Sequence, residues 1–176
     1  MNYLCKYSSP LGEITLKSDG SALTGLWFEK HRYADIPKTG EFDEKELPVF
    51  DETKKWLDLY FSGRDPGFTP KIAYDVPDFA AMVMEEMIRI PFGKTVTYGD
   101  IARCISEKTG KNPCAQAVGG AVGHNPISLI VPCHRVVGKS GSLTGYGGGI
   151  ERKAALLKLE KADMSGMFVP KKGTAL

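Results

Sequence analysis

The chain has 176 residues, of which 42% are hydrophobic and 25% charged, and its formal net charge is +2. A chain of this length and composition buries one sizeable core or two small ones, which excludes a disordered protein. No apolar run approaches the roughly 20 residues of a membrane span, and the N-terminus lacks the basic-then-apolar pattern of a secretory signal. We therefore expect a cytoplasmic protein with no membrane partner.

Charge is distributed unevenly along the chain. Residues 1–77 hold 10 Lys and Arg against 13 Asp and Glu, whereas residues 78–176 hold 13 against 8. A basic second half beside an acidic first half favours a polyanionic partner for the second half only.

The cysteines indicate neither a disulfide framework nor a metal centre. Four are present, Cys5, Cys104, Cys114 and Cys133, and in the expected compartment they remain reduced thiols. No CxxC pair or His doublet accompanies them, so the spacing predicts no zinc site. No cofactor or metal is expected.

The first half predicts a small sheet with one helix. Apolar alternation, a turn rich in Ser, Asp and Gly, and helical spacing of large apolar residues carry this prediction. In chain order, the expected elements are strands at 11–16 and 23–28, a loop at 35–46, a helix at 49–61 and one more strand at 72–74.

The second half predicts helices. Asp78 is placed to cap a helix with a Met-rich apolar face, which ends at Pro91. A last helix, with Ile150, Ala154 and Leu157 on its inward face, begins near Ile150.

Two short helices between them fit a helix-turn-helix. Thr97 stands three residues before Asp100, the spacing of a capping box. Asn112 and Pro113 have the chemistry of a cap and a first-turn proline for a helix that ends at Gly123. The face of this helix is almost all Ala and Gly, which suits either dense helix packing or close approach to a nucleic-acid backbone.

A thiol and an imidazole are adjacent at Cys133 and His134. A nucleophilic cysteine needs a group that takes its proton. Neighbours on a strand point to opposite faces, so direct cooperation requires a turn, which Pro132 permits, or a bridging water. Glu160 shares the inward face of the last helix and is the candidate to orient the imidazole. The alternative interpretation is a small buried residue beside an incidental histidine.

The segment Asn125–Gly138 resembles the active-site signature of the O6-alkylguanine-DNA alkyltransferases. Further segments resemble parts of that family in the same order, namely Ser9–Gly12, Ile90–Tyr98, Ala117–Gly119, Gly145–Gly149 and Lys153–Glu160. The likeness is strong over residues 87–160 and looser over residues 9–80.

This resemblance implies an α+β fold. Residues 1–76 would form a ribonuclease H-like domain of a small sheet and a helix. Residues 77–165 would form a winged-helix-like domain that binds DNA and accepts the alkyl group. Residues 166–176 would be a loose tail.

The implied activity is direct repair of DNA in a single turnover. The protein would flip O6-alkylguanine, with O4-alkylthymine as a second candidate lesion, out of duplex DNA. The alkyl group would pass irreversibly to Cys133 without a cofactor. The implied partner is double-stranded DNA, entered through the minor groove by a monomer.

The family's functional residues map onto this sequence one by one. Cys133 would accept the alkyl group, His134 would remove its proton through a water, and Glu160 would polarise His134. Asn125 would hold the cysteine loop, and Tyr98 would donate a hydrogen bond to the purine. The substrate-binding set would be Val136, Tyr146, Gly147, Pro132 and Lys153. The DNA-binding set would be Gln116, Ala115, Ala117, Gly119, Gly120 and Arg135.

One position departs from the family pattern. Gln116 stands where the family usually carries an arginine that fills the gap left by the flipped base. Glutamine can fill that gap but cannot pair with phosphate. Three alternatives remain open from the sequence: a lesion-binding protein without transfer, a Cys-His hydrolase, and a helix-turn-helix regulator.

Overall fold

The computed structural model describes residues 2–38 and 41–171. The chain forms two compact units. The first, here called the sheet unit, is built from the chain up to Asp75 together with Pro126–Ile130. The second, the helical unit, is built from Val76–Asn125 and from Val131 onward. The α+β class expected from the sequence is confirmed.

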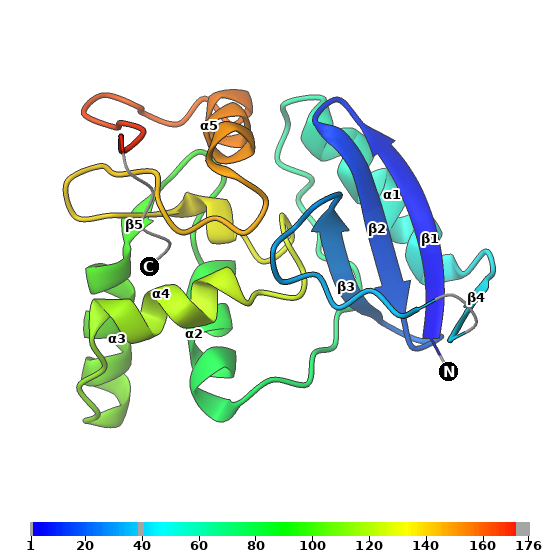
Figure 1. Cartoon of the computed structure of the whole chain (residues 1–176), viewed down its shortest axis with the longest axis horizontal. Helices are drawn as coiled ribbons and strands as arrows, with labels where there is room; N and C mark the ends of the chain where they lie inside the picture. The colour runs from blue at the N-terminus through cyan, green and yellow to red at the C-terminus, as the bar shows by residue number, and fades with distance from the viewer. Residues whose placement is uncertain (1, 39–40, 172–176) are drawn as a thin grey trace. The chain divides into compact units, whose positions relative to one another are not determined.

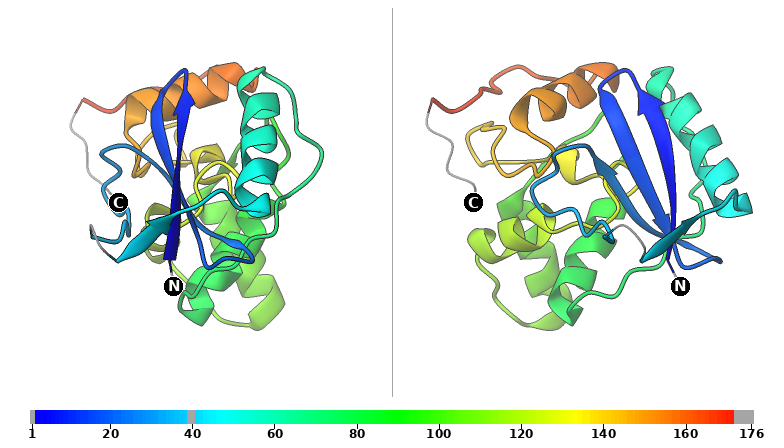
Figure 2. Two further views of the ribbon diagram at one scale, coloured as in Figure 1. Left: turned by 90° about the vertical axis from the view of Figure 1, so that its right-hand side faces the viewer. Right: turned by 45° about the vertical axis from the view of Figure 1, so that its right-hand side comes forward.

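The sheet unit consists of a four-stranded sheet with a helix on one face (Figures 1 and 2). Its elements are β1 (Asn2–Ser9), β2 (Gly12–Ser18), β3 (Leu23–Phe28), β4 (Phe42–Glu44) and α1 (Pro48–Phe61). The strand order is β3-β2-β1-β4, in which only the β1–β4 pair is parallel. The expected hairpin is the β2–β3 pair. β1 was not expected, and β4 lies inside the expected loop.

The core of this unit lies between the sheet and α1. Leu16 and Phe28 contribute from the strands, and Phe50, Leu57 and Tyr60 contribute from the helix, all fully buried. Burying one such side chain stabilises the fold by about 1.5–3 kcal/mol. The helical spacing visible in the sequence therefore marks the face of α1 that covers the sheet.

The expected strand at 72–74 is reduced to a single bridge beside β3. Leu23 donates its backbone N–H to the Lys71 carbonyl at 2.8 Å, and Ala73 donates to the Leu23 carbonyl at 2.9 Å. The segment covers one part of the β3 edge without extending the ladder.

A segment from the second half of the chain covers the next part of the same edge. Leu26 donates its N–H to the Pro126 carbonyl at 2.8 Å, and Ser128 donates to the Leu26 carbonyl at 2.9 Å. These bonds place Pro126–Ile130 in the sheet unit, although the sequence assigned it to the second domain. No local pattern in the sequence could reveal a pairing across a hundred residues.

The helical unit contains four α-helices and one short 3-10 helix within the described residues. Its elements are α2 (Asp78–Ile88), β5 (Val96–Thr97), α3 (Tyr98–Thr109), α4 (Ala115–Gly123), η1 (Cys133–Arg135), β6 (Val136–Val137) and α5 (Ile150–Leu159). Helices α2, α3 and α4 pack together, and η1 packs against α5 (Figure 1).

Helix caps agree with the sequence in one case and correct it in two. Thr97 and Asp100 form the expected reciprocal capping box of α3. Asp78 is the first residue of α2 rather than its cap. Helix α4 is capped by Cys114, whose sulfur accepts a hydrogen bond from the Ala117 N–H, rather than by Asn112.

Two very short strands position the residues around the cysteine. β5 and β6 pair in parallel, with Val96 opposite Val136. Tyr98 begins α3 directly after β5, and Cys133 opens the 3-10 turn directly before β6. The pairing therefore brings the start of α3 beside the Cys-His turn.

The expected loose tail is partly ordered. Phe168 donates its N–H to the Gly141 carbonyl at 3.1 Å and accepts from the Leu143 N–H at 3.0 Å. Residues 172–176 of that tail lie outside the described residues. Across the described part of the chain, no helix is both long and apolar enough to span a bilayer.

Candidate active site

Cys133 lies at the start of a tight turn inside the helical unit. Its side chain is 3% exposed, and its N–H donates to the Val131 carbonyl at 2.8 Å across Pro132. Pro132 has φ −82° and ψ 67°, so the backbone leaves the extended conformation there. The sequence argument required a turn or a bridging water for Cys133 and His134 to cooperate, and η1 is such a turn.

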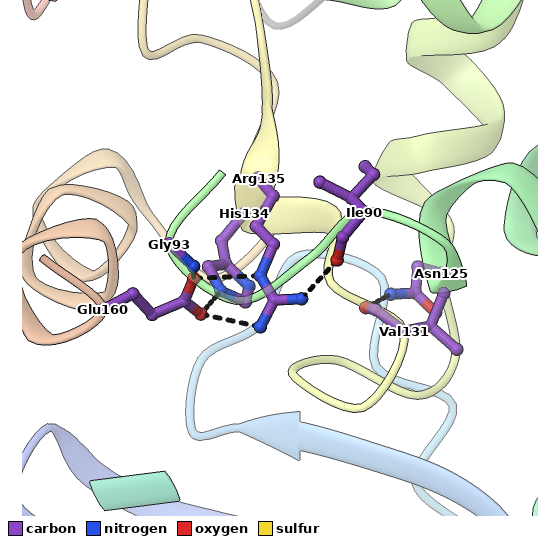
Figure 3. Close-up of polar contacts among 7 residues, drawn as sticks. All are labelled: Ile90, Gly93, Asn125, Val131, His134, Arg135 and Glu160. Atoms are coloured by element: carbon purple, nitrogen blue, oxygen red, sulfur yellow. Dashed lines mark hydrogen bonds and ion pairs between the residues drawn. The ribbon is translucent and has the colours of Figure 1, made fainter. Parts of the chain in front are cut away.

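His134 and Glu160 form a buried pair. Their side chains are fully buried, and His134 Nε2 lies 2.5 Å from Glu160 Oε1 (Figure 3). Glu160 follows the last residue of α5 as its C-cap. One nitrogen of the imidazole is thereby assigned to the carboxylate, which leaves Nδ1 as the atom that would exchange a proton with a thiol.

Arg135 supplies two further hydrogen bonds to Glu160. Its Nε and one terminal nitrogen donate to the two carboxylate oxygens at 2.9 and 3.1 Å, and its other terminal nitrogen donates to the Ile90 carbonyl at 2.7 Å. The Gly93 N–H adds a fourth hydrogen bond to the carboxylate at 2.9 Å (Figure 3). The sequence placed Arg135 among the DNA-binding residues, but its guanidinium is buried and engaged within the protein, so we correct that assignment.

The charges of this network follow from burial and pairing. Burial alone would raise the pKa of Glu160, but the hydrogen bonds and charge of His134 and Arg135 outweigh it and lower that pKa to about 2. Burial lowers the pKa of His134 more than the Glu160 carboxylate raises it. At neutral pH the site therefore holds an ionised carboxylate and a neutral imidazole, which can act as a base.

A second set of buried polar contacts is formed by a lysine and a tyrosine. Lys153 is fully buried and donates to the carbonyls of Val136, at 2.5 Å, and Thr144, at 2.9 Å. The Tyr98 hydroxyl donates to the same Thr144 carbonyl at 2.9 Å. Burial lowers the pKa of Lys153 to about 8, against an opposing effect of the Cys133 charge.

The cysteine also affects the pKa values of two tyrosine hydroxyls. Burial, with the negative charge of a Cys133 thiolate as the second cause, raises the pKa values of Tyr98 and Tyr146. The Tyr146 ring stands edge-on to the His134 ring, with centroids 6.5 Å apart. The charge of Cys133 thus acts on Tyr98, which the sequence placed in the catalytic set, and on Tyr146 and Lys153, which it placed in the substrate-binding set.

Asn125 joins the two residues that flank Pro126–Ile130, the segment that belongs to the sheet unit. Its side-chain N–H donates to the Val131 carbonyl at 2.8 Å, and both residues are buried (Figure 3). Asn125 thereby fixes the backbone two residues before Cys133, in keeping with the expected holding role. Gly147 lies half-buried in the loop after Tyr146.

Helix α4 presents the predicted DNA-binding residues on two different faces. Ala115, Gln116 and Ala117 are exposed, and Gly120 is half-buried with nothing within 4 Å of the position of a β-carbon. Gly119 is buried with the face that packs on the neighbouring helices. One face of the helix is therefore packed within the unit, and the other is exposed.

Within the described residues, no group of three or more His, Cys, Asp or Glu side chains could hold a metal ion. His31 is buried and accepts the Tyr33 N–H through Nδ1. Cys5 lies half-buried on β1, two strands away from the β3 end that leads to His31.

Sequence reasoning missed three contributors to the site. The Gly93 N–H, the Thr144 carbonyl and the Arg135 side chain act through hydrogen bonds that no motif announces. Only the structure reveals why Gly93 is a glycine: it has φ +74°, and a β-carbon there would lie 2.8 Å from the Glu160 carbonyl oxygen. A sequence signal existed for Arg135, because apolar pairs flank the Cys133–Arg135 stretch on both sides and a charge buried there needs a partner.

The fold and the site together define a class: a protein with a buried cysteine adjacent to a histidine that pairs with a buried glutamate, in a unit whose short helices α3 and α4 pack together. Residues 2–74 match the family described as 6-O-methylguanine DNA methyltransferase, ribonuclease-like domain. Residues 78–162 match the DNA binding domain of the same family. The chain belongs to the 6-O-methylguanine DNA methyltransferase family.

Individual relatives agree with this membership. The methylated-DNA–protein-cysteine methyltransferase of Haemophilus influenzae is 42% identical over 161 residues, covering 90% of this chain and 86% of the relative. The Mycobacterium tuberculosis protein of the same name is 43% identical over 159 residues, covering 88% and 89%. A crystal structure of Mycobacterium tuberculosis OGT in complex with DNA shares 38% identity and a TM-score of 0.77, covering 92% of this chain and 96% of that one.

Proposed function

We propose that this protein repairs O6-alkylguanine in double-stranded DNA by moving the alkyl group to Cys133, once per molecule. The observation that carries the proposal is the buried Cys133–His134–Glu160 arrangement in a chain that belongs to this family. O4-alkylthymine is a second candidate lesion. We further propose that the protein acts as a monomer in the cytoplasm.

The transfer is a single displacement at carbon. The neutral imidazole of His134 takes the thiol proton through a water, and the ionised Glu160 stabilises the resulting imidazolium. The Cys133 sulfur forms a bond to the alkyl carbon while the bond from that carbon to guanine O6 breaks. The electron pair leaves with the guanine. Tyr98 would assist its departure by turning its single O–H from the Thr144 carbonyl to the purine and donating a hydrogen bond there.

The base edge would be recognised by the backbone around the cysteine. A carbonyl oxygen has two lone pairs, so the Val136 carbonyl that already accepts from Lys153 can accept from a guanine amino group as well. The Gly147 N–H would donate to the base, with Tyr146 and Pro132 lining the pocket. Lys153 holds the Val136 carbonyl in place for this contact.

The lesion would be delivered by α4 through the minor groove. The exposed residues Ala115, Gln116 and Ala117 carry no bulky or acidic group that would oppose close approach to DNA. Gln116 would occupy the gap left by the flipped base. Sequence preference around the lesion should be weak, because the minor-groove hydrogen-bond pattern is degenerate.

The stoichiometry of transfer tests the proposal. A thioether is stable and no group in the described site could remove the alkyl carbon from it, so the reaction should stop after one equivalent. Titration with duplex oligonucleotide carrying radiolabelled O6-methylguanine should saturate at one methyl group per chain. Continued turnover would indicate a different enzyme, and tight binding without transfer would indicate a lesion-binding protein.

A further inference from the structure

The C-terminal segment Gly166–Pro170 packs along the loop Gly138–Thr144 of the helical unit. Phe168 donates its N–H to the Gly141 carbonyl at 3.1 Å and accepts from the Leu143 N–H at 3.0 Å. Ser142, between those two residues, pairs with Phe168 as an isolated parallel bridge. The segment thus adds backbone contacts on both sides of the loop's tip.

Side-chain packing anchors the same segment. Met167 packs against a buried cluster formed by Val137, Leu143 and Leu157, which belong to β6, the loop and α5. Gly166 and Gly141 approach so closely that a β-carbon on Gly141 would lie 2.3 Å from the Gly166 carbonyl oxygen. This distance leaves no room for any side chain at Gly141 unless the loop and the segment separate.

The loop ends at a carbonyl that two residues of the site use. Leu143, which is tied to Phe168, is followed directly by Thr144. The Thr144 carbonyl accepts both the Tyr98 hydroxyl and the Lys153 ammonium, each at 2.9 Å. Only the φ and ψ angles of Leu143 and Thr144 lie between the Leu143 N–H and the Thr144 carbonyl, so holding the N–H narrows the range of positions that the carbonyl can take.

The segment also borders the surface above Tyr98. Phe168 and Pro170 line a cavity of about 780 Å³ together with Tyr98, Thr144 and Ala115. Its other walls come from the start of α3 and from the loop itself. The segment therefore lies on the face of the unit where Tyr98 and the exposed start of α4 are also found.

We infer that Gly166–Pro170 is a positioning segment of the alkyl-transfer site. It holds the Gly138–Thr144 loop, and the Thr144 carbonyl in turn holds the Tyr98 hydroxyl in place until the hydroxyl turns its single proton to the leaving guanine. The inference rests on the proposed function, because Tyr98 receives its role there. The contacts of the segment go to the loop and to the cluster around Leu143, so it should control departure of the base and not the reactivity of Cys133.

Two glycine variants provide a matched test. Gly141→Ala places a β-carbon against the Gly166 carbonyl, whereas Gly166→Ala meets nothing within 4 Å. Both positions have positive φ, +88° and +76°, so both variants carry a similar backbone strain and differ in the clash. A chain ending at Ser165 removes the segment altogether.

Each variant is assayed for methyl transfer from an O6-methylguanine duplex oligonucleotide and for alkylation of the Cys133 peptide by iodoacetamide. Gly141→Ala and the truncation should slow methyl transfer by about tenfold to a hundredfold, the loss typical of misplacing a reacting group. Gly166→Ala should transfer at close to the wild-type rate. Iodoacetamide labelling of Cys133 should be similar in all four proteins.

A double-mutant comparison separates positioning from general loosening. If the segment acts through Tyr98, adding Gly141→Ala to Tyr98→Phe should produce little further loss. The inference would be overturned if the double variant lost transfer rate by the product of the two single losses. It would also be overturned if iodoacetamide labelling slowed as much as methyl transfer, or if the two glycine variants transferred at equal rates. A wild-type protein that transfers no methyl group would instead overturn the proposed function, and that result is seen before any variant is compared.

Discussion

The sheet unit encloses large apolar side chains with a few hydroxyls and one histidine, whereas the helical unit encloses four ionisable side chains around a thiol. In the described part of the sheet unit no Lys, Arg, Asp or Glu is buried. The helical unit buries His134, Arg135, Lys153 and Glu160, all within hydrogen-bonding reach of the Cys133 turn or of the loop facing it.

This difference separates residues that maintain the fold from residues that perform chemistry. Burying an apolar side chain is favourable by itself, whereas burying a charge is costly unless partners compensate. The Glu160 carboxylate accepts hydrogen bonds from His134, Arg135 and the Gly93 N–H. The concentration of such compensated charge in one unit marks the place where ionised and neutral forms are needed for a reaction.

The largest expected effect comes from replacing Glu160 by Gln. The neutral amide would no longer stabilise an imidazolium, so methyl transfer should slow by about a hundredfold or more. Arg135 would also lose its counter-charge, which should lower the free energy of unfolding by about 3–5 kcal/mol. Rapid-quench transfer assays and urea unfolding measure the two effects.

The matched control for this variant is Glu13→Gln in the sheet unit. Glu13 forms an exposed ion pair with Lys6 at 2.8 Å, and such pairs contribute about 1 kcal/mol or less. Equal losses of stability at Glu13 and Glu160 would contradict the contrast between the two units.

Acid titration should reveal the same carboxylate. The folded pKa of Glu160, about 2, lies below its ordinary value of 4.5, so the stabilisation is complete above pH 4.5 and is lost as pH falls toward 2. The loss attributable to this group is about 3 kcal/mol. Urea unfolding across that range should show a shallower decline for Glu160→Gln than for wild type, and parallel curves would count against the assignment.

Lys153 should also make stability rise with pH, but in a higher pH range. Its folded pKa, about 8, lies below its ordinary value of 10.5, so between these values the unfolded chain binds a proton that the folded chain does not. Wild type should therefore gain about 3 kcal/mol of stability relative to Lys153→Met as pH rises from 8 to 10.5. Lys158→Met, on the exposed face of the same helix, should run parallel to wild type.

The smallest expected effect concerns DNA delivery. Gln116→Arg adds a cation on the exposed face of α4, so affinity for lesion duplex should rise and its dependence on the logarithm of salt should steepen by about one. Transfer from duplex DNA should gain more than transfer from the free alkylated base. Equal rates with duplex and free base would show that the glutamine is a neutral replacement.

Local patterns predicted what depends on local chemistry. The spacing of apolar residues predicted α1, the Thr97–Asp100 spacing predicted the capping box of α3, and the inward stripe of the last helix placed Glu160 beside His134. The family resemblance supplied the remaining assignments, including Tyr98 and Lys153.

Features formed by distant backbone contacts could not be predicted in this way. The pairing of Leu26 with Pro126 and Ser128, and the pairing of Phe168 with the loop, depend on carbonyl and N–H groups that every residue carries. Arg135 was misassigned for a related reason: an arginine beside a DNA-binding motif suggests phosphate, and only the fold reveals that its partner is Glu160.

Mass spectrometry of the protein after exposure to an O6-methylguanine duplex tests the central claim most directly. We expect one added methyl group per chain, located on the Cys133 peptide, and none on the Cys133→Ala variant or on the peptides that contain Cys5, Cys104 and Cys114. A methyl group on any other residue, or undiminished uptake by Cys133→Ala, would contradict the account.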